Sequence, residues 1–561
     1  MKSRYLDIMA RVVDVYDDKR FDSFINKTRE NGIVEHGFPR LCANIGILMA
    51  HGRAMHLRHR FEEMMPICMR DLPTFIDKKH KRANDFSVRE IMACISELES
   101  ARLYPDETIA FWKQRMSLIE PKRFYRMVAP EPPVAVDNWA AFNAASEMAR
   151  CHAGIANTYD FIENQIASQM FPFDENGMYR DPNDPMVYDI VGRNMLSACL
   201  YYGYNGIHKN QLEQHLRKAG LLSLYMQSVT GELPYGGRSN QFLHNEAHIA
   251  VFTEFEASAY KQAGDIQTAS QFKAAAKLAL DCIEHWLDTA PGQHVKNYFP
   301  PDSFIGCEDY AYYDKYMVTI ASFLYLAYQF CDDTISPGTC PATKDECYTW
   351  QTSAAFRKLF CKAGSYFIEL ETRSDHHYDA EGIGRIHRRG APSTICLSVP
   401  VSKTPNYGTP TDNDAPLSIC CGKQIDGQWN FAYENSVYEI TDHHADACSA
   451  YAQLLCTLPN GETIRQSLQV SEDGINICLA GKGALALRLP AFVFDGKAHT
   501  SVTHEKSTVT IFYRGWKCCY TASDTIVDTG MTASNRNGTY RIYQAEGSDT
   551  LTINIKILPC S

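Results

Sequence analysis

The hydrophobic pattern divides the chain into a helical part and a strand-forming part. Before about residue 340, apolar residues recur at spacings of three and four, which is the period of an α-helix packed against a core. The clearest such stretches are residues 45–50, 247–255 and 317–328. After about residue 363, short runs alternate between apolar and polar residues or are rich in β-branched residues, which is typical of strands. The clearest of these runs are residues 365–372, 436–441, 508–513 and 550–557.

The length of the chain, 561 residues, is too great for one ordinary core, so two domains are expected. A stretch rich in Pro, Cys and Thr at residues 336–346 is the predicted linker. We therefore predict a helical domain at residues 1–345 and an antiparallel sheet domain at residues 346–561, with a hairpin turn at Asn460 and Gly461. The periodicity alone leaves open whether the helices form a toroid, a solenoid or a bundle.

The charge of the chain limits its partners. Its formal net charge is −11, and its 45% hydrophobic and 22% charged residues are ordinary for a globular protein. A bulk negative field repels nucleic acid and acidic membranes, so we expect neither as a partner. An acidic substrate would need a local basic cleft.

The cysteines and the N-terminus bear on the compartment. The 20 cysteines include no C-x-x-C pair, so a zinc ribbon or thioredoxin motif has no support. Acidic residues interrupt the first turns, so no apolar signal core is present, and no apolar run reaches the length of a membrane span. We therefore expect a cytoplasmic protein with reduced thiols.

Polar side chains gather in the segment Leu233–His248. Two glycines permit a tight turn, and Ser239 is the predicted N-cap of a helix. Arg238, Asn240, His244 and Asn245 then meet at one helix start, which is an arrangement suited to binding or catalysis. The alternative is an ordinary capped helix whose polar residues face solvent.

A second segment, Gly306–Tyr316, places four tyrosines and three acidic residues before an apolar helix. A tyrosine near a cation can act as an acid or a base, whereas a carboxylate pair such as Glu308 and Asp314 would suit glycoside hydrolysis. The alternative is that the tyrosines pack with their hydroxyls at a wet surface.

A third segment, Arg373–Arg389, is the most polar part of the sheet domain. Together with Asp442–Asp446, it offers enough imidazole and carboxylate groups for a structural divalent metal. The predicted ligands are His377, His443 and Asp379. Histidines on strands are more often surface residues.

A fourth group combines aromatic residues with arginines. Aromatic platforms next to arginine suit a sugar ring that carries a carboxylate, because arginine clamps carboxylates bidentately. The group consists of Asn138, Trp139, residues 177–181, Tyr188, Asp189 and Arg193. The alternative is packing in the core and at helix ends.

From about Asp137 to Pro400, the order of these segments resembles the heparinase II/III-like polysaccharide lyases. The resemblance implies an N-terminal (α/α) toroid followed by an antiparallel β-sandwich. The Glu-x-x-x-x-Tyr pattern from Glu308 makes Tyr313 resemble the catalytic tyrosine of that family. The family's sheet motif has two histidines flanking one residue; here Asp375 holds the first position, and His376 is the nearest substitute.

The resemblance implies cleavage of a uronic-acid-containing glycan by β-elimination. In this hypothesis Asn240 and Arg238 neutralise the uronate carboxylate, while Tyr313 takes one or both of the roles of base and acid and His244 takes the other. His376 or His377 would close the cleft from the sheet side, and no cofactor is required. The remaining predicted substrate-binding residues are Asn245, Trp139, Tyr179, Arg180, Tyr188, Arg193, Tyr310, Glu308 and Arg385. The first three segments are expected to converge on one groove between the two halves of the molecule.

Two alternatives remain. Residues of the first and fourth groups are also similar to a toroidal bacterial family linked to β-glucuronidase activity, which would hydrolyse the bond with paired carboxylates. The pool for such a pair is Asp189, Glu246, Glu308 and Asp314. A glycan-binding scaffold would instead show an aromatic cleft without clustered His, Tyr and Asn.

Overall fold

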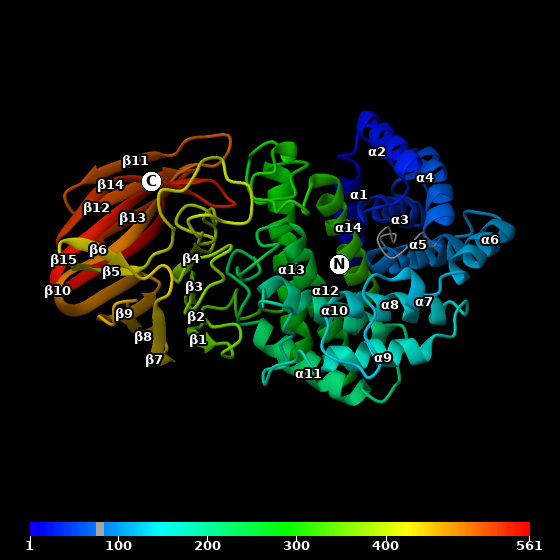
Figure 1. The fold of residues 1–561 in the computed structure, drawn as a ribbon, viewed down its shortest axis with the longest axis horizontal. Helices are drawn as coiled ribbons and strands as arrows, with labels where there is room; N and C mark the ends of the chain where they lie inside the picture. The colour runs from blue at the N-terminus through cyan, green and yellow to red at the C-terminus, as the bar shows by residue number, and fades with distance from the viewer. Residues whose placement is uncertain (75–83, 561) are drawn as a thin grey trace.

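The structure is a computed structural model that describes residues 1–74 and 84–560. Helices occupy the first part of the chain and strands the second, and the two domains lie side by side along the long axis of the molecule (Figure 1). The last helix ends at Phe330 and the first strand begins at Tyr348.

In the described part of the chain, six helices form a closed inner ring. Each contacts the next in chain order, and the last returns to contact the first. Their residues are buried on nearly every side, as expected for helices that are enclosed by others. The inner helices are α3 (Gly37–Ala50), α5 (Val88–Ser100), α8 (Trp139–His152), α10 (Met186–Tyr201), α12 (His244–Gln262) and α14 (Tyr313–Phe330).

An outer layer of helices covers this ring. These helices bury one face only; α1, for example, buries Tyr5, Ile8, Met9 and Val12 at helical spacing. The outer helices are α1 (Lys2–Val13), α4 (Arg58–Asp71), α6 (Asp106–Ser117), α9 (Tyr159–Met170), α11 (Lys209–Ser223) and α13 (Ile266–Thr289). The shorter or peripheral ones are α2 (Asp18–Asn31) and α7 (Pro121–Phe124). The two layers make an (α/α) toroid.

A small antiparallel sheet lies between the toroid and the rest of the strands (Figure 1). Its strands are β1 (Tyr348–Gln351), β2 (Lys358–Ala363), β3 (Tyr366–Glu371) and β4 (Gly382–Arg388). Successive residues of β2 and β3 face opposite sides: Ile368 joins the sandwich core, whereas Phe367 packs with helical residues such as Met186. All residues of these two strands are therefore buried.

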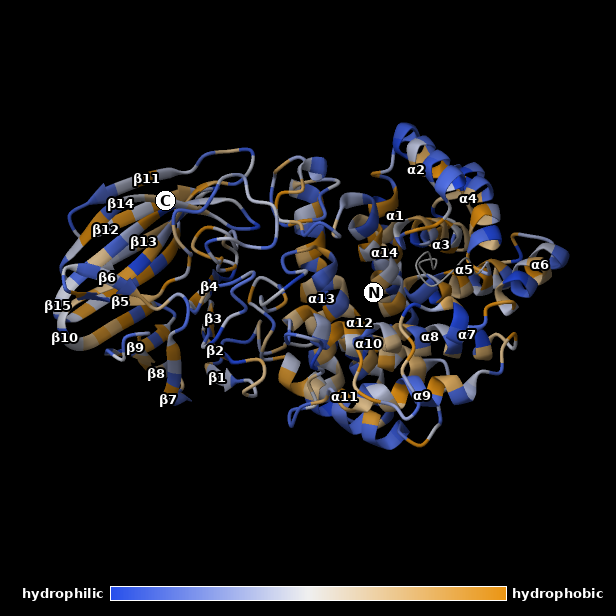
Figure 2. Ribbon diagram, viewed as in Figure 1, coloured by the Kyte–Doolittle hydropathy of each residue, from blue (hydrophilic) through white to orange (hydrophobic). Residues whose placement is uncertain are grey.

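A larger antiparallel sheet packs against the small one and completes a β-sandwich. Its strands alternate between apolar and polar residues (Figure 2), so one face enters the core. Its strands are β5 (Cys421–Ile425), β6 (Gln428–Phe431), β7 (Val437–Ala445), β8 (Ser449–Thr457), β9 (Thr463–Ser471), β10 (Gly474–Phe494), β11 (Ser501–Glu505), β12 (Thr508–Tyr513), β13 (Trp516–Ala522), β14 (Thr525–Ser534) and β15 (Thr539–Pro559).

The predicted toroid followed by an antiparallel β-sandwich is confirmed. The hairpin predicted at Asn460 and Gly461 is also confirmed, because β8 and β9 pair on either side of it and Gly461 has a φ of +86°. Within the described residues, none of the helices combines the length and the apolar character needed to cross a bilayer.

Candidate functional site

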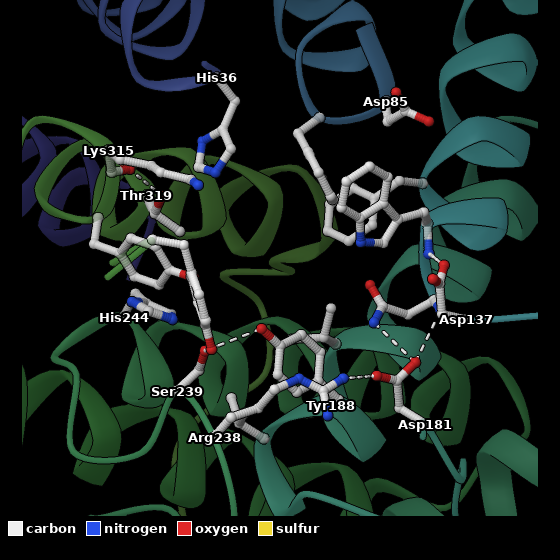
Figure 3. A pocket seen from close by; sticks show the side chains of 18 of the residues that line it. His36, Asp85, Asp137, Asp181, Tyr188, Arg238, Ser239, His244, Lys315 and Thr319 are labelled. Carbon is white, nitrogen blue, oxygen red and sulfur yellow. Dashed lines mark hydrogen bonds and ion pairs between the residues drawn. The ribbon is translucent and has the colours of Figure 1, made fainter. Parts of the chain in front are cut away.

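A cavity of about 520 Å³ opens where the six inner helices begin. Every inner helix contributes residues from its first turns or from the segment just before it. The lining residues that the structure describes all belong to the helical domain. They include Glu35, His36, Arg40, Asp85, Phe86, Arg126, Asp137, Asn138, Trp139, Asp181, Tyr188, Arg238, Ser239, His244, His248, Tyr310, Lys315, Tyr316 and Thr319. Figure 3 shows how several of them face one another.

The helix starts give this cavity a positive character. Each helix N-terminus carries a partial positive charge and unpaired N–H groups, which favour anions. Arg40, Lys315 and Arg238 add full charges, each of them paired: Arg40 with Glu90 at 3.5 Å, Lys315 with Glu35 at 3.1 Å and Arg238 with Asp181. The cavity thus places cationic side chains and helix N-termini within reach of an acidic ligand, although carboxyl groups line it as well.

Ser239 is the centre of a cluster of tyrosine hydroxyls. Its Oγ lies 3.0 Å from the hydroxyl of Tyr188 and 3.0 Å from that of Tyr310. Burial raises the pKa of Tyr188, Tyr310 and Tyr316, and a hydrogen bond with Ser239 partly opposes this increase in each of them. These phenols therefore stay protonated at neutral pH and can donate protons.

His244 lies on the same side of the cavity as Ser239 and Lys315 (Figure 3). Its ring centroid is 5.0 Å from that of Tyr316. Burial lowers the pKa of His244 well below the ordinary value, and the nearby His248 and Arg40 lower it further. Among the described residues, its Nδ1 has no hydrogen-bond partner. A neutral imidazole beside protonated phenols forms a base with acids close by.

Arg238 is held rigidly at the floor of the cavity. Its guanidinium donates to a carboxylate oxygen of Asp181 and to the carbonyl oxygen of Pro182 at 2.7 Å, and it stacks 4.4 Å from the centroid of Tyr188. Asp181 also accepts from the backbone and side-chain amides of Asn138, each at 2.9 Å. The guanidinium is consequently pre-oriented by groups of the toroid.

Carboxyl groups line the opposite side of the cavity. Asp137 and Asp181 lie across from His244 and Lys315 (Figure 3). Burial raises the pKa of Asp137 to about 6, and the charges of Asp181 and Asp85 add to the increase. Asp137 accepts one backbone hydrogen bond, from Trp139 at 3.1 Å. The cavity thus has a basic and phenolic side and an acidic side.

Comparison with solved structures places the architecture of the chain. Heparinase III aligns over 92% of this chain and 76% of its own, with 9% sequence identity and a TM-score of 0.50. The chain has the heparinase III fold. A mutant of the heparan sulfate lyase HepC from Pedobacter heparinus aligns over 93% of this chain and 76% of its own, with 9% identity and a TM-score of 0.47. No protein-family model matches the sequence, and neither does any curated protein.

On this heparinase III fold, the structure brings several predicted site residues into one cavity. Five of them line it: His244, Arg238, Trp139, Tyr188 and Tyr310. Three others lie directly behind the lining. Asn245 donates to the carbonyl oxygen of Ser239 at 3.3 Å, Glu308 accepts from the Ser239 N–H at 2.6 Å, and Asn240 is buried beside Gln241. Ser239 does not cap the helix as predicted, because α12 begins five residues later at His244.

Tyr313 lies outside the cavity, which corrects the expectation that it shares a groove with His244. It is the first residue of α14 and faces α1 and α2, with its ring 4.2 Å from the Arg20 guanidinium and 5.3 Å from the His294 ring. It lines a separate depression with Asp302 and Cys307. Tyr310 and Tyr316, three residues away on either side, are the tyrosines of this segment that reach the cavity.

Four predicted substrate-binding residues also lie elsewhere. Tyr179 is fully buried and donates to Gln169 at 2.5 Å, and Arg180 forms an exposed pair with Asp184. Arg193 is buried in a bidentate pair with Asp189. Arg385, on β4, is buried against Glu369 at 3.1 Å. Each of these side chains is committed to a partner outside the cavity.

The sheet-domain histidines do not reach the cavity either. His376 contacts Glu381 at 2.8 Å, and His377 contacts Asp375 at 2.7 Å. The third segment does approach the loop before α12, because a carboxylate oxygen of Asp379 accepts from the Gly237 N–H at 2.6 Å. The first two segments therefore converge, and the third reaches them only through a contact with the backbone. The expected groove between the two halves is wrong, because the described residues that line the cavity all belong to the helical domain.

The predicted metal site is not formed. His443 lies on β7 next to Thr349, away from His377 and Asp379. Within residues 1–74 and 84–560, no group of three His, Cys, Asp or Glu side chains is arranged to hold a metal ion.

The carboxylate pool for a hydrolase is likewise outside the cavity. Asp189 pairs with Arg193, Glu246 with Lys296, Glu308 with Arg536, and Asp314 with Arg20. A pair for hydrolysis would have to come from Asp85, Asp137, Asp181 or Glu35, which line the cavity.

Sequence reasoning missed several lining residues. His36 and Arg40 come from the first inner helix, where Arg40 donates to Nδ1 of His36 at 3.0 Å and to Thr319 at 2.9 Å. Tyr316 and Lys315 come from the tyrosine-rich segment, where another tyrosine was selected. One signal could have found them: each polar or aromatic residue stands at the beginning of a helix that is apolar on all sides.

Proposed function

We propose that this chain is a lyase that cleaves uronic-acid-containing glycans in the cavity at the start of the inner helices. The observation that carries the proposal is the neutral His244 beside phenols gathered on Ser239, within a ring of helix N-termini and cationic side chains. This is the set of groups that β-elimination needs: a positive site for a carboxylate, a base and an acid. The heparinase III fold is compatible with it.

In the proposed reaction, Arg238 and Lys315 bind the uronate carboxylate and, with the helix N-termini, stabilise the negative charge that develops on it. His244 accepts the C5 proton. A phenol of the Ser239 cluster, Tyr316 being the one nearest the imidazole, protonates the leaving O4 atom as the C4–O4 bond breaks. A C4–C5 double bond forms, no water is consumed, and no cofactor takes part.

The test is to mix the full-length protein with oligosaccharides of heparan, chondroitin, hyaluronan and alginate and to follow ultraviolet absorbance. A 4,5-unsaturated uronate product absorbs there, so rising absorbance together with new reducing ends supports the lyase. New reducing ends without absorbance would favour hydrolysis, and neither signal with any of the glycans would contradict the proposal.

Hydrolysis is the second candidate because of one observation. Asp137, with its pKa raised to about 6, faces a cavity that also holds Asp181, whose carboxylate is paired with Arg238, so an acid and a base could come from these two carboxyls. Asp137 would then protonate the glycosidic oxygen.

The pH dependence of turnover separates the two mechanisms. If neutral His244 is the base, kcat should stay nearly constant from about pH 6.5 to about pH 8.5, because its pKa lies well below this range. If protonated Asp137 is the acid, kcat should fall about tenfold per pH unit above its pKa of about 6. A pH–rate profile with saturating substrate measures the difference, and a steep fall above pH 7 would contradict the His244 mechanism.

Tyr313→Phe should leave kcat within about threefold of the wild type, because this phenol faces Arg20 outside the cavity. Removing a general acid would instead lower kcat by about 10²-fold or more. Steady-state kinetics on the glycan that the wild type cleaves best measures it. The matched variant is Tyr316→Phe, which removes a hydroxyl that lines the cavity and should lower kcat by about 10²-fold. A large loss of kcat in Tyr313→Phe with little loss in Tyr316→Phe would show that Tyr313, and not Tyr316, is the catalytic tyrosine.

A further inference from the structure

The turn between β14 and β15 inserts two side chains from the sandwich into the helical domain. Arg536 is buried and forms a bidentate ion pair with Glu308, with N···O distances of 2.7 Å and 3.1 Å. It also donates to the carbonyl oxygen of Gly306 at 2.6 Å and stacks 4.0 Å from the ring centroid of Tyr407. In Figure 1 this part of the sandwich extends toward the toroid.

The ion pair continues to the cavity. The same carboxylate oxygen of Glu308 that faces Arg536 accepts from the backbone N–H of Ser239 at 2.6 Å. The next residue of the turn, Asn537, donates from its side-chain amide to the Gln241 side-chain oxygen at 3.1 Å and to the Lys296 carbonyl at 2.8 Å. Two adjacent residues of the sandwich thus hold two nearby residues of the loop before α12.

The two residues that they hold are the strained ones. Ser239 has a φ of +58° and Gln241 a φ of +62°, which side chains other than glycine rarely adopt. Such conformations persist only where the surroundings determine them, and they are often found at functional sites. In this loop the other domain adds one contact for each residue: Arg536 binds Glu308, which accepts from the Ser239 N–H, and Asn537 binds the Gln241 side chain directly.

We propose that Arg536 and Asn537 are positioning residues, through which the β-sandwich sets the conformation of Ser239 and hence the orientation of the phenols in the cavity. The inference rests on the proposed function for its catalytic consequence. It also gives the sandwich a role at the cavity, although it contributes no lining residue among those described.

The proposal predicts that losing these contacts lowers turnover but leaves substrate binding nearly unchanged. Ser239 organises Tyr188 and Tyr310, whereas Arg238 is oriented by Asp181 and Pro182 of the toroid. Losing the contacts of the sandwich should therefore misplace the proton-transferring groups and leave the carboxylate site in place. A displacement of about 1 Å at such groups can lower turnover by about 10²-fold.

The experiment compares full-length Arg536→Lys, Asn537→Ala and the control Arg488→Lys. Lysine keeps the charge at 536 but cannot form two parallel hydrogen bonds to Glu308. Asn537→Ala leaves the ion pair intact and serves as the second variant if the first does not fold. Arg488 is a buried arginine of the sandwich that stacks on Phe431, away from the loop.

Two readouts are measured on each variant. Hydrogen–deuterium exchange should accelerate about tenfold or more in residues 236–243 for both test variants, with the toroid core unchanged and no effect in the control. With the substrate identified for the wild type, kcat should fall about 10- to 100-fold while KM changes much less.

The readouts also separate this inference from the proposed function. Local acceleration of exchange in a protein that cleaves none of the glycans supports the positioning and contradicts the lyase proposal. Unchanged exchange in residues 236–243 with unchanged kcat in both folded test variants overturns the positioning proposal. A fall in kcat equal to that of the Arg488→Lys control also overturns it.

Discussion

His244→Gln should lower kcat by about 10³-fold, within the range lost when a general base is removed. The glutamine amide fills a similar volume and retains hydrogen-bonding capacity, but it cannot accept a proton from a carbon acid. The native imidazole is suited to this task because burial keeps it neutral and its side chain lines the cavity. Steady-state kinetics on the best glycan substrate, with thermal unfolding to check the fold, measures the effect.

His387→Gln is the matched control. His387 is also a buried histidine whose pKa burial lowers, to about 3, but it lies on β4 and bonds Ser398 at 2.9 Å and Ser228 at 2.6 Å. His387→Gln should change kcat by less than about threefold if the loss in His244→Gln comes from the missing base and not from the loss of a buried histidine. Near-full turnover in His244→Gln would remove His244 from the mechanism and leave the acidic side of the cavity as the source of chemistry.

The fold was largely readable from the sequence because the two periods of hydrophobic residues differ. Spacings of three and four before residue 340 and alternation after residue 363 correctly separated helices from strands. Closure of the ring was not readable, since it depends on contacts between α3 and α14, which lie far apart in the chain and share no visible repeat. Pairing of the strands into two sheets was hidden for the same reason.

The candidate site was readable where polar residues stand just before a helix, as for Arg238 and His244. It was misread at Tyr313 because α14 is buried on nearly every side. The sequence of an amphipathic helix shows which face points inward, but that of a helix that is apolar all round does not. Tyr313 was therefore selected from the spacing of the Glu-x-x-x-x-Tyr motif. Arg536 was out of reach, because its contact with Glu308 joins residues 228 positions apart.

Lys296→Met should lower the free energy of unfolding by about 3–5 kcal/mol, the cost of leaving a buried ion pair without one partner. Lys296 is buried between Glu246 at 2.6 Å and Glu232 at 3.2 Å, close to the boundary of the two domains. Burial lowers its pKa, but the two carboxylates outweigh this effect and raise it, so the ammonium is charged in the folded protein. Methionine fills the space and removes the charge. Urea unfolding measures the loss.

The exposed pair of Lys277 with Asp281 supplies the control, and Lys277→Met should change stability by less than about 1 kcal/mol. The pH dependence gives a further check. Burial already raises the folded-state pKa of Glu246, and without Lys296 it loses the cation that opposes this rise, so its pKa moves further above that of the unfolded chain. Folding then takes up protons, and stability is lost as pH rises. The loss of stability caused by Lys296→Met should be larger at about pH 8 than at about pH 5. The opposite order would mean that the charge of Lys296 does not stabilise the buried carboxylates.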